Sequence, residues 1–458
     1  MSDRFMLLLG AFGLLLVILI QGAQLNKGEK KHKLVELKLD KKNKAHGVIF
    51  GKQNGKVMYS PIEVEKHILC TAGSGCGKTS ALLIPTLRSW QGTSFTIDIS
   101  GDISRNCPDM PDKIVFEPEN DSTIPYDVFA SIDEIKDKDK QDEALVQLAY
   151  TLIPEPPNMS ANAKYFADGG RKVLSSALIY GYRKGSDFCR ICYNVVASNW
   201  QDLFSEILDG DVPKAKMYLN SFTGSNDQNT AGCYQQACDA VQLFATSADV
   251  AHSVHRPHDG EIALTPNNIE DKNIFIIIQD EKLELYSPLL NIIVSQFMSY
   301  ISARPVPPKG DPHYDDFTWV LMALDEFASL SIDDQTMLAA LRKYRKKKVR
   351  IMALTQSLAD IILLYGHDAT RAMLANFKYT LLLGGLGDLE SLKYFAEVIG
   401  YKKTTKRSIS HSSRDTSRTE SEDKEYIIEP ADLDRMGDKA VLISEEGHFI
   451  LDKNFYYK

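Results

Sequence analysis

The chain has 458 residues, of which 44% are hydrophobic and 25% charged, and its formal net charge is −8. This length predicts two or three domains, and the acidic balance excludes a generally basic nucleic-acid coat, so any contact with DNA would need local basic patches. Seven cysteines, an odd number, favour a reduced cytosolic compartment over a disulfide framework.

An uncharged apolar run opens the chain at residues 5–20 (FMLLLGAFGLLLVILI). With its flanks it reaches the ~17–25 residues that span a bilayer, so we expect residues 1–26 to be a transmembrane anchor, with a cleaved signal peptide as the alternative. Only Arg4, beside Asp3, precedes the run, whereas residues 27–44 hold eight lysines and three acids. The positive-inside tendency therefore predicts a single-pass protein of the inner or plasma membrane with its C-terminal bulk in the cytoplasm. The lysine-rich segment fits either contact with anionic headgroups or a solvated linker.

A glycine-rich loop follows the strand-like run HILC and precedes the helix-like run ALLIPTL. Its glycines would let consecutive backbone N–H groups approach phosphate oxygens, Lys78 would reach the β and γ phosphates, and Thr79 would give its hydroxyl to Mg²⁺. The alternative is a strand-to-helix turn without a ligand. The predicted nucleotide-binding residues are Ala72, which stands where a first glycine is usual, Gly73, Ser74, Gly75, Cys76, Gly77, Lys78, Thr79 and Ser80.

Short, nearly continuous apolar runs recur along the chain and suit a buried parallel sheet with helices between its strands. They lie at 67–70, 94–99, 113–118, 273–278, 319–324, 350–355 and 379–384. Between about 140 and 255 this pattern gives way to helical spacing, which predicts an all-helical insertion. The Ser/Thr-rich stretch 404–424 is expected to be a mobile surface loop.

These patterns predict an α/β fold with a nucleotide-binding domain in two parts. The expected divisions are the anchor (1–26), the first part with the phosphate loop (27–145), an all-α domain (146–258) and the second part (259–458).

An acidic pair, Asp325-Glu326, follows the apolar run at 319–324. At the carboxyl edge of a strand, Asp325 would hold the water shell of Mg²⁺, and Glu326 would orient and deprotonate the attacking water. This pair favours an ATP hydrolase over a small GTP switch; the alternative is a strand that ends in two solvated acids. Gln356, after the next apolar run, could sense the γ-phosphate and couple its loss to movement.

Seven of the nine residues from Arg342 to Arg350 are basic. Three interpretations stay open: a solvated loop, a patch for DNA phosphates, and an arginine supplied to the active site of a neighbouring subunit.

Cysteine pairs at 189/192 and 233/238, and histidines at 252, 255 and 258, could suggest zinc. The cysteines lie in apolar helical sequence, where buried thiols are common. Pro257 would interrupt a helix through the histidines, which argues against a metal-ligand geometry there.

The chain resembles the type IV secretion coupling proteins, the TraG/TraD-like ATPases of bacterial conjugation. The resemblance rests on HILCTAGSGCGKTSALLIPTLRSW, YFADGGRKVLSSALIY, LMALDEFASL and ALTQS, and covers nearly the whole predicted cytoplasmic part. In FTIDISGD, Asp98, Gly101 and Asp102 match a family motif, whereas Ile99 and Ser100 replace its Pro and Lys.

The resemblance implies a RecA-like domain with an inserted helical domain, assembled as a homo-hexamer on the cell membrane, with ATP and Mg²⁺ as cofactors. Arg345 falls where the family has an arginine that reaches into the adjacent subunit, although Tyr344 stands where a glycine is usual. Family members recognise a relaxase–DNA complex and pass it to a secretion channel. They usually have two membrane spans, whereas this sequence shows one.

We therefore predict a membrane-anchored ATPase that couples a relaxase–DNA or protein substrate to type IV secretion channel proteins and drives conjugative DNA transfer. Glu326, Arg345 and Gln356 are the predicted catalytic residues, and Thr79 and Asp325 the Mg²⁺ residues. One alternative is an FtsK/SpoIIIE-type DNA translocase, which would be expected to carry a C-terminal DNA-reading module longer than the stretch after residue 425. The other is a substrate receptor that binds ATP without hydrolysing it.

Overall fold

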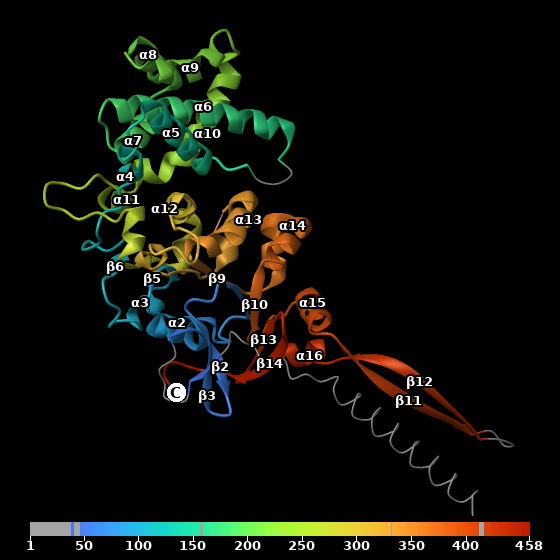
Figure 1. The fold of residues 1–458 in the computed structure, drawn as a ribbon. Coiled ribbons are helices and arrows are strands. Elements are labelled where there is room, and N and C mark those ends of the chain that lie inside the picture. Colours follow the sequence, from blue (N-terminus) through green and yellow to red (C-terminus); the bar gives the residue numbers. More distant parts are fainter. Residues whose placement is uncertain (1–37, 41–45, 156–158, 331, 412–415) are drawn as a thin grey trace, which may run out of the picture.

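The computed structural model describes residues 38–40, 46–155, 159–330, 332–411 and 416–458 (Figure 1). The predicted anchor at 1–26 lies outside these ranges. Within them, every helix is too short or too polar to cross a membrane.

A twelve-stranded sheet forms the centre of the fold, in the order β1-β3-β2-β14-β13-β10-β4-β9-β8-β5-β7-β6. The strands from β10 through β6 pair in parallel, and the remaining strands add antiparallel pairs beside β10. The strands are β1 (Lys38–Asp40), β2 (Gly47–Gln53), β3 (Lys56–Pro61), β4 (His67–Thr71), β5 (Thr93–Ile99), β6 (Lys113–Phe116), β7 (Asn273–Ile278), β8 (Val320–Leu324), β9 (Val349–Thr355), β10 (Phe377–Leu382), β13 (Lys439–Ser444) and β14 (Gly447–Asp452). The predicted α/β fold with a large, mostly parallel sheet is confirmed.

Helices cover both faces of the sheet, so its central strands are buried on both sides. Alternate residues of a strand point to opposite faces. In β4, Leu69 joins the core under α12 (Leu283–Ala303), whereas Ile68 and Cys70 join the core under α2 (Ile84–Ser89). This double burial explains why the strands are continuous apolar runs instead of alternating ones. The other helices around the sheet are α3 (Asp102–Arg105), α13 (Asp334–Lys343), α14 (Leu358–Leu374), α15 (Leu389–Ile399) and α16 (Pro430–Asp434).

A run of helices without strands lies between β6 and β7 in the chain and forms the upper part of the molecule in Figure 1. Its members are α4 (Ala130–Asp133), α5 (Lys138–Leu152), α6 (Ala161–Arg183), α7 (Phe188–Ala197), α8 (Trp200–Asp209), α9 (Pro213–Leu219), α10 (Asp227–Thr246) and α11 (Ala248–Ser253).

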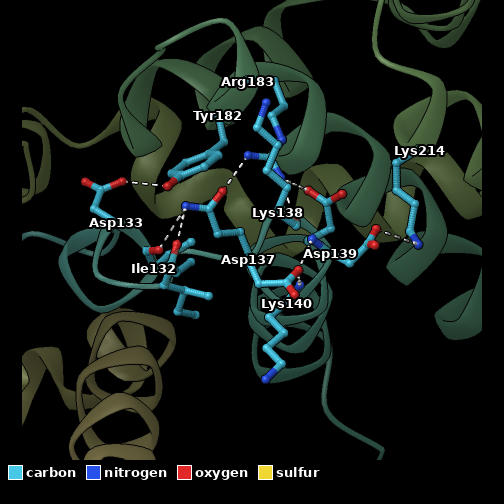
Figure 2. A network of polar contacts seen from close by, with 12 residues as sticks. Ile132, Asp133, Asp137, Lys138, Asp139, Lys140, Tyr182, Arg183 and Lys214 are labelled. Carbon is cyan, nitrogen blue, oxygen red and sulfur yellow. Dashed lines mark hydrogen bonds and ion pairs between the residues drawn. The ribbon is translucent and has the colours of Figure 1, made fainter.

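Polar contacts tie the end of α6 to α4 and α5 (Figure 2). Arg183 donates to Gln141 at 2.6 Å and to Asp142 at 2.5 Å, and the Tyr182 hydroxyl donates to Asp133 at 2.6 Å. These bonds hold the end of α6 against α4 and α5.

The expectation of a loop at 404–424 is wrong, because the described residues of this stretch form two strands. Strands β11 (Tyr401–His411) and β12 (Thr416–Tyr426) pair antiparallel as a separate hairpin that projects from the body (Figure 1). The rings of Tyr401 and Tyr426 stack 4.8 Å apart at its base. The high Ser/Thr content predicted irregular structure, but threonine is β-branched and suits an extended strand.

Candidate nucleotide-binding site

The phosphate loop leaves the carboxyl end of β4 in the middle of the parallel strands. The Ala72 N–H donates to the Thr355 carbonyl of β9 at 3.1 Å, which holds the start of the loop beside the next strand. Gly75 and Gly77 have φ of 72° and 105°, a region that other residues rarely adopt. Lys78 then begins a one-turn helix, Lys78–Leu83, that continues into α2. Strand, loop and helix are thus arranged as the sequence predicted.

A second glycine-rich segment, residues 384–387, packs against this loop, and sequence analysis missed it. The Gly73 N–H donates to the Gly384 carbonyl at 3.0 Å. A Cβ on Gly73 would lie 1.8 Å from the Gly385 carbonyl oxygen, so the two backbones touch only because residue 73 has no side chain. The run GGLG directly after a predicted strand was the available signal.

Gly73→Ala should therefore separate the two loops, lower the thermal unfolding temperature and weaken ATP binding at least tenfold. Forced overpacking of this kind costs about 1–3 kcal/mol. Thermal melts and titration with a fluorescent ATP analogue measure both effects. Gly55→Ala is the steric control, because nothing lies within 4 Å of an added Cβ there, although its φ of 74°, unlike that of Gly73, lies in the left-handed region. Equal behaviour of the two variants would contradict the close approach.

Lys78 is nine-tenths buried and has two oxygen partners within the chain. Its Nζ donates to the Ala72 carbonyl at 2.9 Å and lies 3.4 Å from Oε1 of Glu326. The same oxygen lies 3.5 Å from Nε2 of Gln356. Side chains from the ends of β4, β8 and β9, which are neighbours in the sheet, therefore meet at one point.

Asp325 lies directly behind this group and is almost fully buried. Among the described residues, its Oδ1 has no hydrogen-bond partner. Burial, and secondly the charge of Glu326, raises the pKa of Asp325 to about 7. A buried carboxylate oxygen without a partner, near a lysine that can bind phosphate, fits the ligand chemistry of Mg²⁺. Asp325 is therefore a candidate ligand for the ion or its waters, and the role of Thr79 stays a prediction.

The nucleotide-free chain should lose stability as the pH rises from about 4 to 7. In that interval folded Asp325 keeps a proton that an unfolded aspartic acid, with pKa near 3.9, has released. Asp325→Asn should remove this loss and unfold at a higher urea concentration at pH 8, by a free energy on the order of a few kcal/mol. The measurement is urea unfolding at pH 5 and pH 8 without Mg²⁺ or nucleotide, with exposed Asp102→Asn as control. An unchanged pH dependence in Asp325→Asn would contradict the burial argument.

Asp98, which the family resemblance singled out, has a local structural role. Its two carboxylate oxygens accept the N–H groups of Ile103 and Ser104 at 3.2 and 2.7 Å. Ser100 and Gly101 between them have positive φ, so the carboxylate holds a tight strand-to-helix turn. Burial raises the pKa of Asp98 above its usual value.

Arg345 lies at the other edge of the sheet from its own phosphate loop. It belongs to the short turn Tyr344–Lys347 before β9, whereas Gln356 follows β9. Seven strand residues separate the two edges, roughly 20 Å at about 3.3 Å per residue. Its charge, after burial and Arg350, lowers the pKa of His67 at the amino end of β4, to about 3. Within one chain, Arg345 is not brought together with Lys78 and Glu326.

The basic run around Arg345 divides into packing and surface residues. Arg350 is fully buried and donates to the carbonyls of Lys66 and Pro61, and buried Lys348 donates to the Phe317 carbonyl at 2.9 Å. Arg342, Lys343 and Lys346 are exposed. Any DNA-phosphate patch in this run is therefore smaller than the sequence count indicated.

The cysteines do not form a metal site in the described part of the chain. Cys192, Cys233 and Cys238 are buried, and the Cys189 thiol contacts the Val254 carbonyl at 3.2 Å. Burial raises the pKa of Cys189 to about 12, so its thiol stays protonated. These thiols contribute to packing.

The C-terminal segment also contacts the phosphate loop, which sequence analysis did not predict. The Tyr456 N–H donates to the Ser80 carbonyl at 3.0 Å, and the Phe455 ring lies 3.3 Å from the position of a Cβ on Gly77. The Arg88 guanidinium of α2 lies over the Tyr456 ring. The segment thus supports the loop through contacts at Gly77 and Ser80.

Comparison with known proteins gives relatives for this architecture. VirD4 of Rhizobium rhizogenes is 23% identical over 441 residues, which are 92% of this chain and 63% of that protein. VirD4 of Agrobacterium fabrum is 22% identical over 430 residues, 90% of this chain and 62% of that protein. The chain thus spans less than two thirds of the length of these relatives.

Solved structures share the fold. The bacterial conjugative coupling protein TrwBdeltaN70 superimposes with a TM-score of 0.67 at 17% identity, covering 90% of this chain and 89% of that one. The plasmid coupling protein TrwB in complex with ADP and Mg²⁺ gives a TM-score of 0.67 at 18% identity, covering 91% of this chain and 90% of that one.

Residues 19–458 match the sequence profile of the family described as type IV secretory system conjugative DNA transfer. This match extends over the phosphate loop, the helical region and the carboxyl-edge acids. The chain therefore belongs to the conjugative DNA transfer family of type IV secretion systems.

Proposed function

We propose that this protein is a membrane-anchored coupling ATPase, which hydrolyses ATP to pass a relaxase–DNA or protein substrate to a type IV secretion channel. The observation that carries the proposal is the meeting of Lys78, Asp325, Glu326 and Gln356 at the carboxyl edge of three neighbouring strands. Family membership supports the secretion role. The solved complex of TrwB with ADP and Mg²⁺ supports both cofactors.

The geometry supports a mechanism in which Lys78 exchanges protein oxygens for phosphate oxygens. Its ammonium lies between the Ala72 carbonyl and Glu326. A bound triphosphate would compete for Lys78 and release the Glu326 carboxylate, which could then orient and deprotonate water. Mg²⁺ would supply neutralisation of the phosphate charge, with Thr79 and Asp325 as its protein residues.

Gln356 is placed to respond to the presence or loss of the γ-phosphate. Its amide lies at the carboxyl end of β9 beside Glu326, and α14 begins two residues later. When the γ-phosphate leaves, any bond from Gln356 to it is lost, and the start of α14 could shift. This is the proposed link between hydrolysis and movement.

Arg345 is proposed to act in the site of a neighbouring subunit. Its place at the amino edge of the sheet keeps it from its own loop, and the buried Tyr344, whose hydroxyl donates to the Met298 carbonyl at 2.6 Å, fixes the turn that carries it. A homo-hexameric ring would bring this edge to the next phosphate loop, where an arginine stabilises charge in the transition state.

DNA transfer from the native host tests the proposed function. We expect that deleting the gene abolishes conjugative transfer, that the full chain restores it, and that Lys78→Ala does not, although the variant reaches the membrane in equal amount. Transfer that continues without the protein would overturn the secretion role. A soluble protein in cell fractionation would overturn the anchor. Rescue by Lys78→Ala would instead favour a receptor that needs no ATP.

A further inference from the structure

The connection from α11 to β7 holds a cluster of histidines and a glutamate. Its ends are fixed, because the Tyr126 N–H donates to the Ser253 carbonyl at 2.8 Å and the Leu264 N–H donates to the Pro125 carbonyl at 2.7 Å. Val254 and Leu264 are fully buried. The intervening residues therefore run over the surface between two anchored points.

A tight turn folds this segment back on itself. The Glu261 N–H donates to the His258 carbonyl at 2.9 Å, and Gly260 supplies a φ of 85°. The turn returns the Glu261 carboxylate to the two imidazoles: Oε2 lies 3.1 Å from Nε2 of His255 and accepts the His258 N–H at 2.9 Å. One ligand atom each from His255, His258 and Glu261 lie within 4.8 Å of one another.

The cluster contains only two of the three histidines that recur every third residue in the sequence. His252 lies at the end of α11, and its Nε2 contacts the Asp121 carbonyl at 3.2 Å. Glu261 takes the third place instead. Helix α11 ends at Ser253, before Pro257. The loop that follows brings the ligand atoms together.

Arg256, between the histidines, fastens the cluster to the helical region. Its guanidinium lies 3.2 Å from Asp133 and over the rings of Phe129 and Tyr182, while its N–H donates to Asp187 at 3.3 Å. Tyr182 and Asp133 are themselves hydrogen-bonded (Figure 2). The loop backbone is thus held in place, with His255 and Glu261 only partly exposed.

We propose that His255, His258 and Glu261 bind a divalent transition-metal ion, of which Zn²⁺ fits best. Two imidazoles and a carboxylate suit Zn²⁺ rather than Mg²⁺ or Ca²⁺, which prefer oxygen ligands. Tetrahedral bonds of about 2.1 Å place ligand atoms about 3.4 Å apart, so the present cluster needs only a small contraction.

The proposed metal site shares no residue with the nucleotide site. A bound ion would have a structural role in the loop between α11 and β7. The loop joins the helical region to β7, a strand of the same sheet that carries the ATPase residues on other strands. An ion bound there would cross-link three positions of this connection and stiffen the junction, and it would raise the unfolding temperature as the concentration of free metal rises above the dissociation constant.

Titration of the tag-free full chain in detergent with Co²⁺ and Zn²⁺ tests the proposal. We expect one equivalent of Co²⁺ with the visible absorption bands of tetrahedral coordination, which Zn²⁺ displaces. His255→Ala, His258→Ala and Glu261→Gln should each weaken binding at least tenfold. His252→Ala is the matched control, His313→Ala removes an exposed histidine paired with Asp316, and Asp325→Asn excludes the nucleotide site.

The three control variants should retain the bands and the stoichiometry. The proposal is overturned if wild-type protein gives no tetrahedral Co²⁺ spectrum, or if the ligand variants bind as well as His252→Ala. Circular dichroism confirms folding of each variant. Glu261→Gln, the mildest change, still decides the question if a histidine variant fails to fold.

Discussion

Glu326→Gln should bind ATP as well as the wild type and lower turnover by about 10²–10⁴-fold, the usual contribution of a general base. Glutamine keeps the size of the side chain and accepts the same backbone conformation, in which residue 326 has a φ of 48° and ψ of 51°. It also removes the ion pair with Lys78, so the lysine meets no competing charge when phosphate arrives. Binding of a fluorescent ATP analogue and steady-state phosphate release measure the two effects separately.

Lys78→Ala is the contrasting variant, because it should lose both binding and turnover. Its ammonium lies beside the phosphate loop at the carboxyl edge, where it is placed to meet the phosphates directly. Turnover of Glu326→Gln within twofold of the wild type would remove Glu326 from the chemistry and leave a strand that ends in two acids.

Arg345→Ala should keep ATP binding and lower turnover of the assembled protein by about 10³-fold or more, the range for an arginine supplied to phosphoryl transfer. The reason is positional, since the residue lies at the amino edge of β9 and cannot reach its own phosphate loop. Arg342→Ala is the matched control, because Arg342 is exposed in the same basic run. If both variants lose activity equally, and only with DNA present, the run serves as a phosphate patch.

Mixing two inactive variants separates action in trans from action in cis. An Arg345→Ala subunit has an intact phosphate loop, and a Lys78→Ala subunit has an intact Arg345. In a mixed ring, some interfaces combine both intact halves and should recover turnover. Co-purification through two different tags shows that mixed assemblies form. Mixed rings without any recovery would contradict the proposed shared site.

The sequence predicted the parallel strands well where double burial makes them continuous apolar runs. The expected run at 273–278 coincides with β7, and 94–99 lies within β5. The antiparallel strands β2, β3, β13 and β14 were not predicted. Their apolar stretches are short and mixed with glycine, lysine or serine, so their patterns are hard to separate from loops.

Some features of the candidate site were also predictable from the sequence, and others were not. Asp325 and Glu326 were predictable because they directly follow an apolar strand, and Lys78 because it ends the glycine-rich loop after another such strand. Parallel strands bring their carboxyl ends together. The contact of Gly73 with Gly385 and the raised pKa of Asp325 depend on packing between distant segments. The loop that joins His255 to Glu261 depends on a turn at Gly260, which spacing between histidines does not reveal.

The most direct test of the account is the ATPase rate of the purified full chain against its concentration, with and without single-stranded DNA. A ring with a shared active site predicts a rate per subunit that rises steeply with concentration and with DNA, and that collapses in both Glu326→Gln and Arg345→Ala. A rate per subunit that is independent of concentration, DNA and Arg345 would contradict the shared-site motor. Tight ATP binding without hydrolysis under every condition would leave a substrate receptor instead.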